Sequence, residues 1–115
     1  MNENRDVTLE TNRILLHTIR SCDNSIKHLN NLINVSDLFD EDEAFKLVKT
    51  ESIKRIKFLE HKKTVCNKLG MEIKNLKTEK NINVNALCVC AKALVGYDPF
   101  MELEELLERK TTKHE

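Results

Sequence analysis

The sequence predicts an all-α fold, a bundle of three to four helices, and three observations lead to this expectation. Two glycines and one proline in 115 residues are too few for the repeated tight turns of a β-fold or a phosphate-binding loop. Charged residues make up 33% and apolar residues 40%, a balance typical of amphipathic helices. Apolar residues also recur at helical spacing. We expect one domain, residues 1–115, in which a long antiparallel, coiled-coil-like helix pair carries two shorter C-terminal helices.

The first helix is expected over about 7–35, because its apolar residues follow a heptad pattern. They lie 4, 3, 4, 3 and 4 residues apart, which places them within an arc of about 80° on one helix face. Asn12 extends this seam toward the N-terminus, where a polar residue can fix register. The candidate helix-packing seam consists of Leu15, Ile19, Cys22, Ile26, Leu29 and Ile33.

An acidic segment, 36–43, follows this helix. Ser36, Asp37 and Asp40 are all competent N-caps, and the acidic run suits the positive end of the next helix dipole. The segment lacks the glycine and the spaced oxygen ligands of an EF-hand loop, so helix capping is favoured over calcium binding.

The second helix is expected over about 41–77, with a break at Gly70 left open. Its apolar residues form two adjoining stripes that together cover about half of the helix circumference. A helix with so wide an apolar arc contacts at least two neighbours, so we expect it to be the central helix. Ile53 and Met71 fall outside both stripes. One stripe contains Phe45, Val48, Ile56, Leu59, Cys66 and Ile73, and the other contains Leu47, Phe58, Val65, Leu69 and Leu76.

The third helix is expected over about 85–95, a segment with one charged residue. A buried strand would also fit its Val and Cys content, but no second strand exists to pair with it, which favours a helix. Because it is apolar on most sides, it should pack against the first two helices or against another chain.

The fourth helix is expected over about 99–110, and the tail 111–115 should fray. Gly96 can end the third helix in the left-handed conformation, and Asp98 followed by Pro99 is typical of a helix N-terminus. The apolar face of this helix consists of Phe100, Leu103, Leu106 and Leu107.

The net charge of zero conceals a segregation along the chain. Residues 1–45 hold 4 basic and 9 acidic side chains, residues 46–80 hold 11 and 4, and residues 81–115 hold 4 and 6. The basic charge of the second helix can be matched inside the bundle, can bind an acidic partner protein, or can bind nucleic-acid phosphates. A pI near 6.9, few aromatic residues and a single arginine in 46–80, Arg55, make nucleic acid unlikely. The candidate partner-binding residues are Lys46, Lys49, Arg55, Lys57, Lys62 and Lys68.

Cys22, Cys66, Cys88 and Cys90 occupy positions where an apolar residue would fit, so we interpret them as small buried hydrophobic residues rather than a disulfide framework. A zinc site would need Cys88, Cys90 and a histidine from elsewhere. The Cys-x-Cys spacing puts its two thiols on different sides of a helix, which disfavours this site. We expect no metal and no cofactor. The histidines considered for this site are His17, His28, His61 and His114.

The chain contains no motif of catalysis: no glycine-rich phosphate loop, no HExxH, no GxSxG and no CxxC. The function expected is therefore non-catalytic protein–protein interaction, as a small adaptor, a chaperone or a subunit of a larger assembly that forms a homo- or hetero-oligomer. A nucleic-acid-associated helical protein is the alternative, and a thiol or metal enzyme a remote one. The polar N-terminus and the absence of a long apolar stretch predict an intracellular, cytoplasmic protein without a membrane span, with the nucleus as an alternative location.

Overall fold

The computed structural model describes residues 2–77 and 83–100, with side chains described for 7–75 and 84–100. It contains helices α1 (Asn2–Asp37), α2 (Glu43–Lys77) and α3 (Asn83–Gly96). No strand occurs within these ranges, so the predicted all-α class is confirmed. Residues 99–100 are helical, but the rest of the expected fourth helix, about 99–110, and the tail 111–115 lie outside the described residues.

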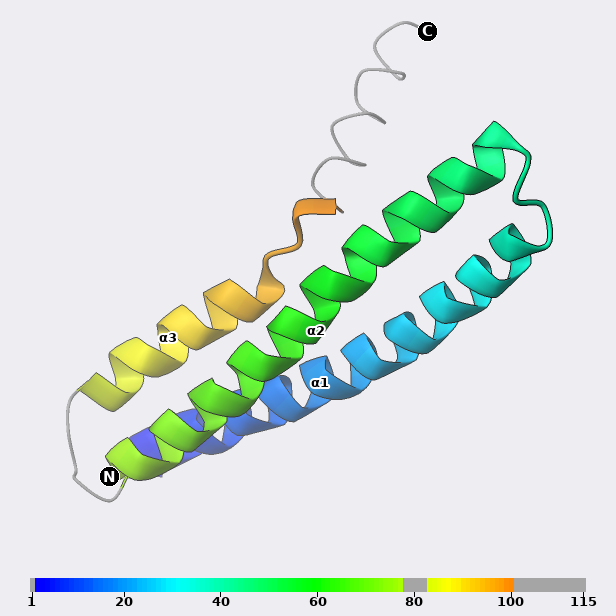
Figure 1. The fold of residues 1–115 in the computed structure, drawn as a ribbon. Coiled ribbons are helices and arrows are strands. Elements are labelled where there is room, and N and C mark those ends of the chain that lie inside the picture. The colour runs from blue at the N-terminus through cyan, green and yellow to red at the C-terminus, as the bar shows by residue number, and fades with distance from the viewer. Residues whose placement is uncertain (1, 78–82, 101–115) are drawn as a thin grey trace, which may run out of the picture.

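The chain runs along α1, reverses at a turn and returns along α2, and α3 lies against both helices (Figure 1). Ion pairs between the helices follow the same path of the chain. Asp37 contacts Lys49 next to the turn, whereas Asp23 contacts Lys63 farther along the two helices. Near the opposite end, Glu10 of α1 contacts Lys92 of α3. α3 therefore covers the part of the hairpin that is distant from the turn.

α1 is longer than the heptad pattern indicates. It begins at Asn2 instead of about residue 7 and ends at Asp37 instead of about residue 35. Thr8 and Thr11 are buried, and the Thr11 hydroxyl donates to the Val7 carbonyl at 2.8 Å. The first residues of α1 carry no heptad of apolar side chains, so apolar periodicity does not reveal where the helix begins.

The α1–α2 turn, 38–42, provides a different cap from those expected. The backbone N–H of Ala44 donates to Asp42 Oδ1 at 2.8 Å, which makes Asp42 the N-cap of α2. The expectation for Ser36, Asp37 and Asp40 was wrong, because α1 continues through Asp37 and Asp40 lies in the middle of the turn. Ser36 is instead buried inside α1, where its hydroxyl donates to the Leu32 carbonyl.

α2 is continuous through Gly70, so the break considered there does not occur. A Cβ atom placed on Gly70 would lie 3.9 Å from Leu15 Cδ1, an ordinary contact. Of the two apolar stripes, Leu47 and Val48 near the turn are exposed and Leu76 lies outside the described side chains. The remaining stripe residues are buried or half-buried, and Ile53 and Met71 are exposed.

The core lies where all three helices meet. α1 contributes Leu15, and half-buried side chains of α1, α2 and α3 surround the cluster. Four of the seven buried residues of this cluster belong to α3, because one face of this short helix packs against α1 and α2. The cluster consists of Leu15, Cys66, Ile73, Val84, Cys88, Ala91 and Val95, with Val7, Ile14, Ile19, Leu69 and Leu87 packed against it.

Two residues at the end of α3 were expected to act as helix signals. Gly96 is the last residue of α3, but its backbone is not in the left-handed conformation expected from the sequence. The Tyr97 N–H donates to the Leu94 carbonyl at 3.2 Å, so the helix ends in one tight turn. Asp98 does cap the residues that follow it, because its Oδ1 accepts the Phe100 N–H at 3.0 Å.

Candidate interaction surfaces

The candidate heptad seam faces the interior of the hairpin. Leu15 and Cys22 are buried, and the other four seam residues, Ile19, Ile26, Leu29 and Ile33, are half-buried. The seam is therefore occupied by α2 within the same chain.

Ion pairs match acids of α1 with bases of the other two helices. Lys49 Nζ lies 2.7 Å from Asp37 Oδ1, Lys63 pairs with Asp23, and Lys92 Nζ lies 3.3 Å from Glu10 Oε1. The hydrogen bond to Asp23 raises the pKa of the Lys63 ammonium. These ion pairs match part of the acidic charge of α1 with basic charge of α2 and α3 in the same chain. Since most of these side chains are well exposed, each pair adds little stability and acts mainly on the register of the helices.

The six candidate partner-binding cations divide into two groups. Four of them contact the chain itself: Lys46 pairs with Glu43, Lys49 pairs with Asp37, Arg55 pairs with Glu51, and Lys62 lies over the Phe58 ring. The other two, Lys57 and Lys68, are exposed and form no ion pair with a described residue. The structure does not bring the six together as one site.

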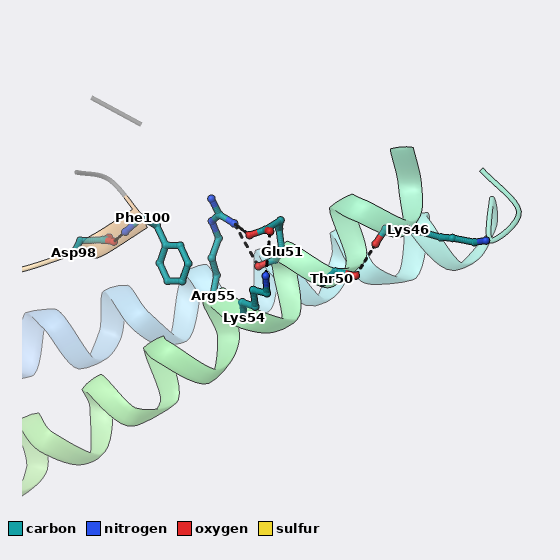
Figure 2. Close-up of polar contacts among 7 residues, drawn as sticks. All are labelled: Lys46, Thr50, Glu51, Lys54, Arg55, Asp98 and Phe100. Atoms are coloured by element: carbon teal, nitrogen blue, oxygen red, sulfur yellow. Dashed lines mark hydrogen bonds and ion pairs between the residues drawn. The ribbon is translucent and has the colours of Figure 1, made fainter. Parts of the chain in front are cut away.

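Arg55 lies between Glu51 and Phe100 (Figure 2). Its guanidinium Nη1 is 3.1 Å from Glu51 Oε2, and its Cζ is 4.6 Å from the centre of the Phe100 ring. The Phe100 ring also meets the Phe58 ring edge-to-face at 5.6 Å. Arg55 thereby joins α2 to the residues after α3 through a cation–π contact.

A groove of about 600 Å³ opens beside this arginine, between α1 and α2. Its lining combines apolar rings with hydrogen-bonding groups such as His28 and Asp98. Arg55 lies at its edge and shares the Glu51 carboxylate with Lys54. Its full lining is Asn24, Ser25, His28, Leu29, Arg55, Phe58, Leu59, Asp98 and Phe100.

The four cysteines are free thiols in two environments. Cys22, Cys66 and Cys88 are buried, as the sequence predicts, and burial raises the pKa of the Cys22 and Cys66 thiols. Cys90 is exposed, contrary to expectation, because it lies on the side of α3 that faces away from the hairpin. Within the described residues, no group of three or more His, Cys, Asp or Glu side chains could hold a metal ion.

Large apolar side chains are exposed around the α1–α2 turn. Leu38 is 77% exposed and Leu47 is 62% exposed, and Phe39 stacks on Phe45 with ring centres 4.6 Å apart. We call this surface the tip patch; it consists of Val35, Leu38, Phe39, Leu47 and Val48. Five exposed acids surround it: Asp37, Asp40, Glu41, Asp42 and Glu43.

A second apolar surface lies on α3. Val89 is 66% exposed, Leu94 53% and Tyr97 54%. Leu94 and Tyr97 also line a small cavity of about 100 Å³ beside Phe58 and Val65 of α2. We call this surface the α3 outer face; it consists of Ala86, Val89, Cys90, Ala93, Leu94 and Tyr97.

The sequence contained a signal for each apolar surface. In α3 the signal is the near absence of charge on every side of the helix, which predicts packing against the first two helices or against another chain. At the turn, Leu38 and Phe39 interrupt an acidic run that was interpreted only as helix capping. Apolar residues inside a polar turn indicate an exposed patch when no helix is long enough to cover them.

No helix in the described parts of the chain is long and apolar enough to cross a membrane. No protein-family model matches the chain, and neither a characterised protein nor a solved structure shows significant similarity to it.

Proposed function

We propose that this chain is a non-catalytic protein-interaction module, acting as an adaptor, a chaperone or a subunit of a larger assembly. The observation that carries this proposal is the tip patch. Five large apolar side chains are 39–77% exposed at the turn of a small helical hairpin, and the largest exposed apolar patch of a protein is often an interaction site.

The partner that fits the tip patch is a protein segment that is both apolar and basic, such as one face of a basic amphipathic helix. Apolar side chains of the partner would pack on Leu38, Phe39 and Leu47. Its cations would face the surrounding acids, of which Asp40 and Glu41 form no ion pair with a described residue. Charge complementarity of this kind selects the partner and accelerates association more than it adds affinity.

The heptad seam has a supporting role in this proposal. Because Leu15, Cys22 and the half-buried seam residues hold α1 against α2, they fix the positions of both halves of the tip patch. The segregated charge supports the same arrangement, since the α1 acids Asp23 and Asp37 bind α2 lysines and set the register of the hairpin.

Site-specific photo-crosslinking in the native source tests the proposal. A photoreactive side chain is introduced at Leu38, and a matched one at Ser21, which is exposed on α1 away from the turn. We expect protein adducts at position 38 and few at position 21. Leu47→Glu should remove the adducts, and so should the double substitution Asp40→Lys and Glu41→Lys. Equal adducts at both positions, or adducts that survive Leu47→Glu, would contradict the proposal.

A nucleic-acid-associated protein is the second candidate. It is favoured by Lys57 and Lys68, which are exposed on α2 without an ion pair to any described residue. Binding to a mixed DNA and RNA pool at low salt tests it, because phosphate contacts are strongest there. Absence of binding under those conditions would eliminate this candidate.

A further inference from the structure

α3 is apolar on two opposite sides. Val84, Cys88, Ala91 and Val95 form its buried side, while the residues of the α3 outer face are exposed. At one end of this face, Leu94 and Tyr97 also line the small cavity beside α2. The single charged residue of α3, Lys92, is half-buried at its edge and pairs with Glu10 of α1 at 3.3 Å. A helix that is apolar all round is normally covered all round. Within the described ranges 7–75 and 84–100, α1 and α2 cover one side of α3 and leave Val89, Leu94 and Tyr97 more than half exposed on the other.

We propose that the α3 outer face binds the α3 outer face of a second copy of this chain, with the two α3 helices antiparallel about a two-fold axis. This inference concerns a different surface from the tip patch and does not depend on it. A two-fold contact is isologous, so each residue i that meets residue j of the partner is met by j in return.

The absence of charge on the α3 outer face argues for a second copy as the occupant. A surface that meets itself places like charges opposite one another, which costs stability, and all six residues of this face are uncharged. A partner of opposite charge would gain nothing here. The tip patch, by contrast, is ringed by acids and is unsuited to self-association.

The sizes of the side chains are also self-complementary. An axis between positions 91 and 92 places Ala86 opposite Tyr97, Val89 opposite Leu94, and Cys90 opposite Ala93. The largest side chain of the face thus meets one of the smallest, as close helix packing requires. Ala93 and Cys90 near the axis let the two helices approach closely.

The expected dimer is weak because α3 is short. A helix of 14 residues is about 21 Å long, so a symmetric α3 pair buries less than the roughly 1,600 Å² of a standard protein interface. We therefore expect dissociation in the micromolar range, with dimers at high protein concentration and monomers on dilution.

Sedimentation velocity across the micromolar range is the first test. The wild-type chain should show a concentration-dependent monomer–dimer equilibrium. Val89→Glu places a carboxylate in each half of the interface and should weaken the dimer by at least about 100-fold. Leu16→Glu is the matched control, because Leu16 is also well exposed, at 57%, but lies on α1. Circular dichroism should show unchanged helicity in both variants, since both positions are exposed.

Disulfide formation tests the register in a Cys90→Ser background. A Val89→Cys chain mixed with a Leu94→Cys chain should form mixed disulfide dimers, because the two positions oppose each other. Chains carrying Val89→Cys alone should form far fewer, since position 89 does not meet its own copy. A wild-type chain that stays monomeric at high concentration, or a dimer that is insensitive to Val89→Glu, would overturn the inference. A dimer sensitive to Leu47→Glu instead would assign self-association to the tip patch and overturn it as well.

Discussion

Hydroxyl side chains allow α1 to bury polar residues without leaving a polar atom unpaired. Thr11, Thr18 and Ser36 each donate to the carbonyl four residues earlier at 2.8 Å. Among the described residues, no buried side-chain nitrogen or oxygen lacks a partner. A threonine or serine satisfied in this way packs like a small apolar residue. This explains how α1 can extend well beyond the end of its heptad pattern.

At the residue scale, the cap of α2 gives the first prediction. Asp42→Ala removes the carboxylate that accepts the Ala44 N–H, so the free energy of unfolding should fall by about 1 kcal/mol. Thermal or denaturant unfolding followed by circular dichroism measures the change.

The control for this substitution is Asp40→Ala. Asp40 was a cap candidate in the sequence, but it lies in the middle of the turn and should contribute within about 0.5 kcal/mol, like other exposed residues. Equal effects of the two substitutions would mean that Asp42 does not act as the cap.

The roles of single residues were harder to predict from the sequence than the helices or the fold class. Four acids stand within six residues of one another in 37–42, and the sequence does not say which one follows the end of α1. Gly96 is a common helix terminator, but the left-handed conformation depends on the path of the next residues. The exposure of Cys90 depends on the packing of α3, which sequence spacing alone does not specify.

At the element scale, α2 organises the molecule. It contacts both other helices, as its two stripes indicate, and it carries the lysines that pair with α1. Its bounds and those of α3 lie within two residues of the expected ones. Helix periodicity and composition therefore locate an element well when apolar residues define it. They fail for the start of α1, because residues 2–6 contain no apolar side chain that would mark the helix.

Gly70 provides the prediction at this scale. It lies inside α2, has no left-handed backbone, and has room for a methyl group 3.9 Å from Leu15 Cδ1. Gly70→Ala should therefore raise the free energy of unfolding by roughly 0.5–1 kcal/mol, the difference in helix propensity. Denaturant unfolding monitored by circular dichroism measures it.

Gly96→Ala is the matched comparison. A Cβ atom there meets nothing within 4 Å, but Gly96 is the terminal residue of α3, so its gain should be smaller. A loss of stability in Gly70→Ala would show that α1 and α2 approach more closely at Leu15 than the structure indicates.

At the scale of the whole molecule, the reactivity of the buried cysteines measures how readily the helical bundle opens. In the folded monomer only Cys90 is exposed, while burial of Cys22 and Cys66 both hinders access and raises the pKa of their thiols, which leaves less of the reactive thiolate. We expect one thiol to react rapidly with an alkylating reagent and three to react only when the bundle opens.

Mass spectrometry of alkylated protein counts the modified thiols over time. The experiment is done at nanomolar concentration, where the proposed α3 dimer is dissociated and Cys90 is accessible. Cys90→Ser should abolish the rapid phase. Two or more rapidly reacting thiols would contradict the packing of the core.

The fold class was predictable as a whole, because helix periodicity, composition and the scarcity of turn residues all indicate the same class. The candidate surfaces were not. The heptad seam resembles a binding surface in the sequence, since nothing in a heptad pattern distinguishes a partner helix in the same chain from one in another chain. The exposed faces become visible only when the packing shows which apolar residues α1 and α2 leave uncovered.

The position of α3 in the core also has a consequence for synthesis of the protein. Leu15 emerges from the ribosome 80 residues before Val95, the last member of the same core cluster. At typical translation rates of about 5–20 residues per second, Val95 is synthesised roughly 4–16 s after Leu15. During this interval the α1 seam is only partly covered. The core therefore cannot close before α3 has been synthesised.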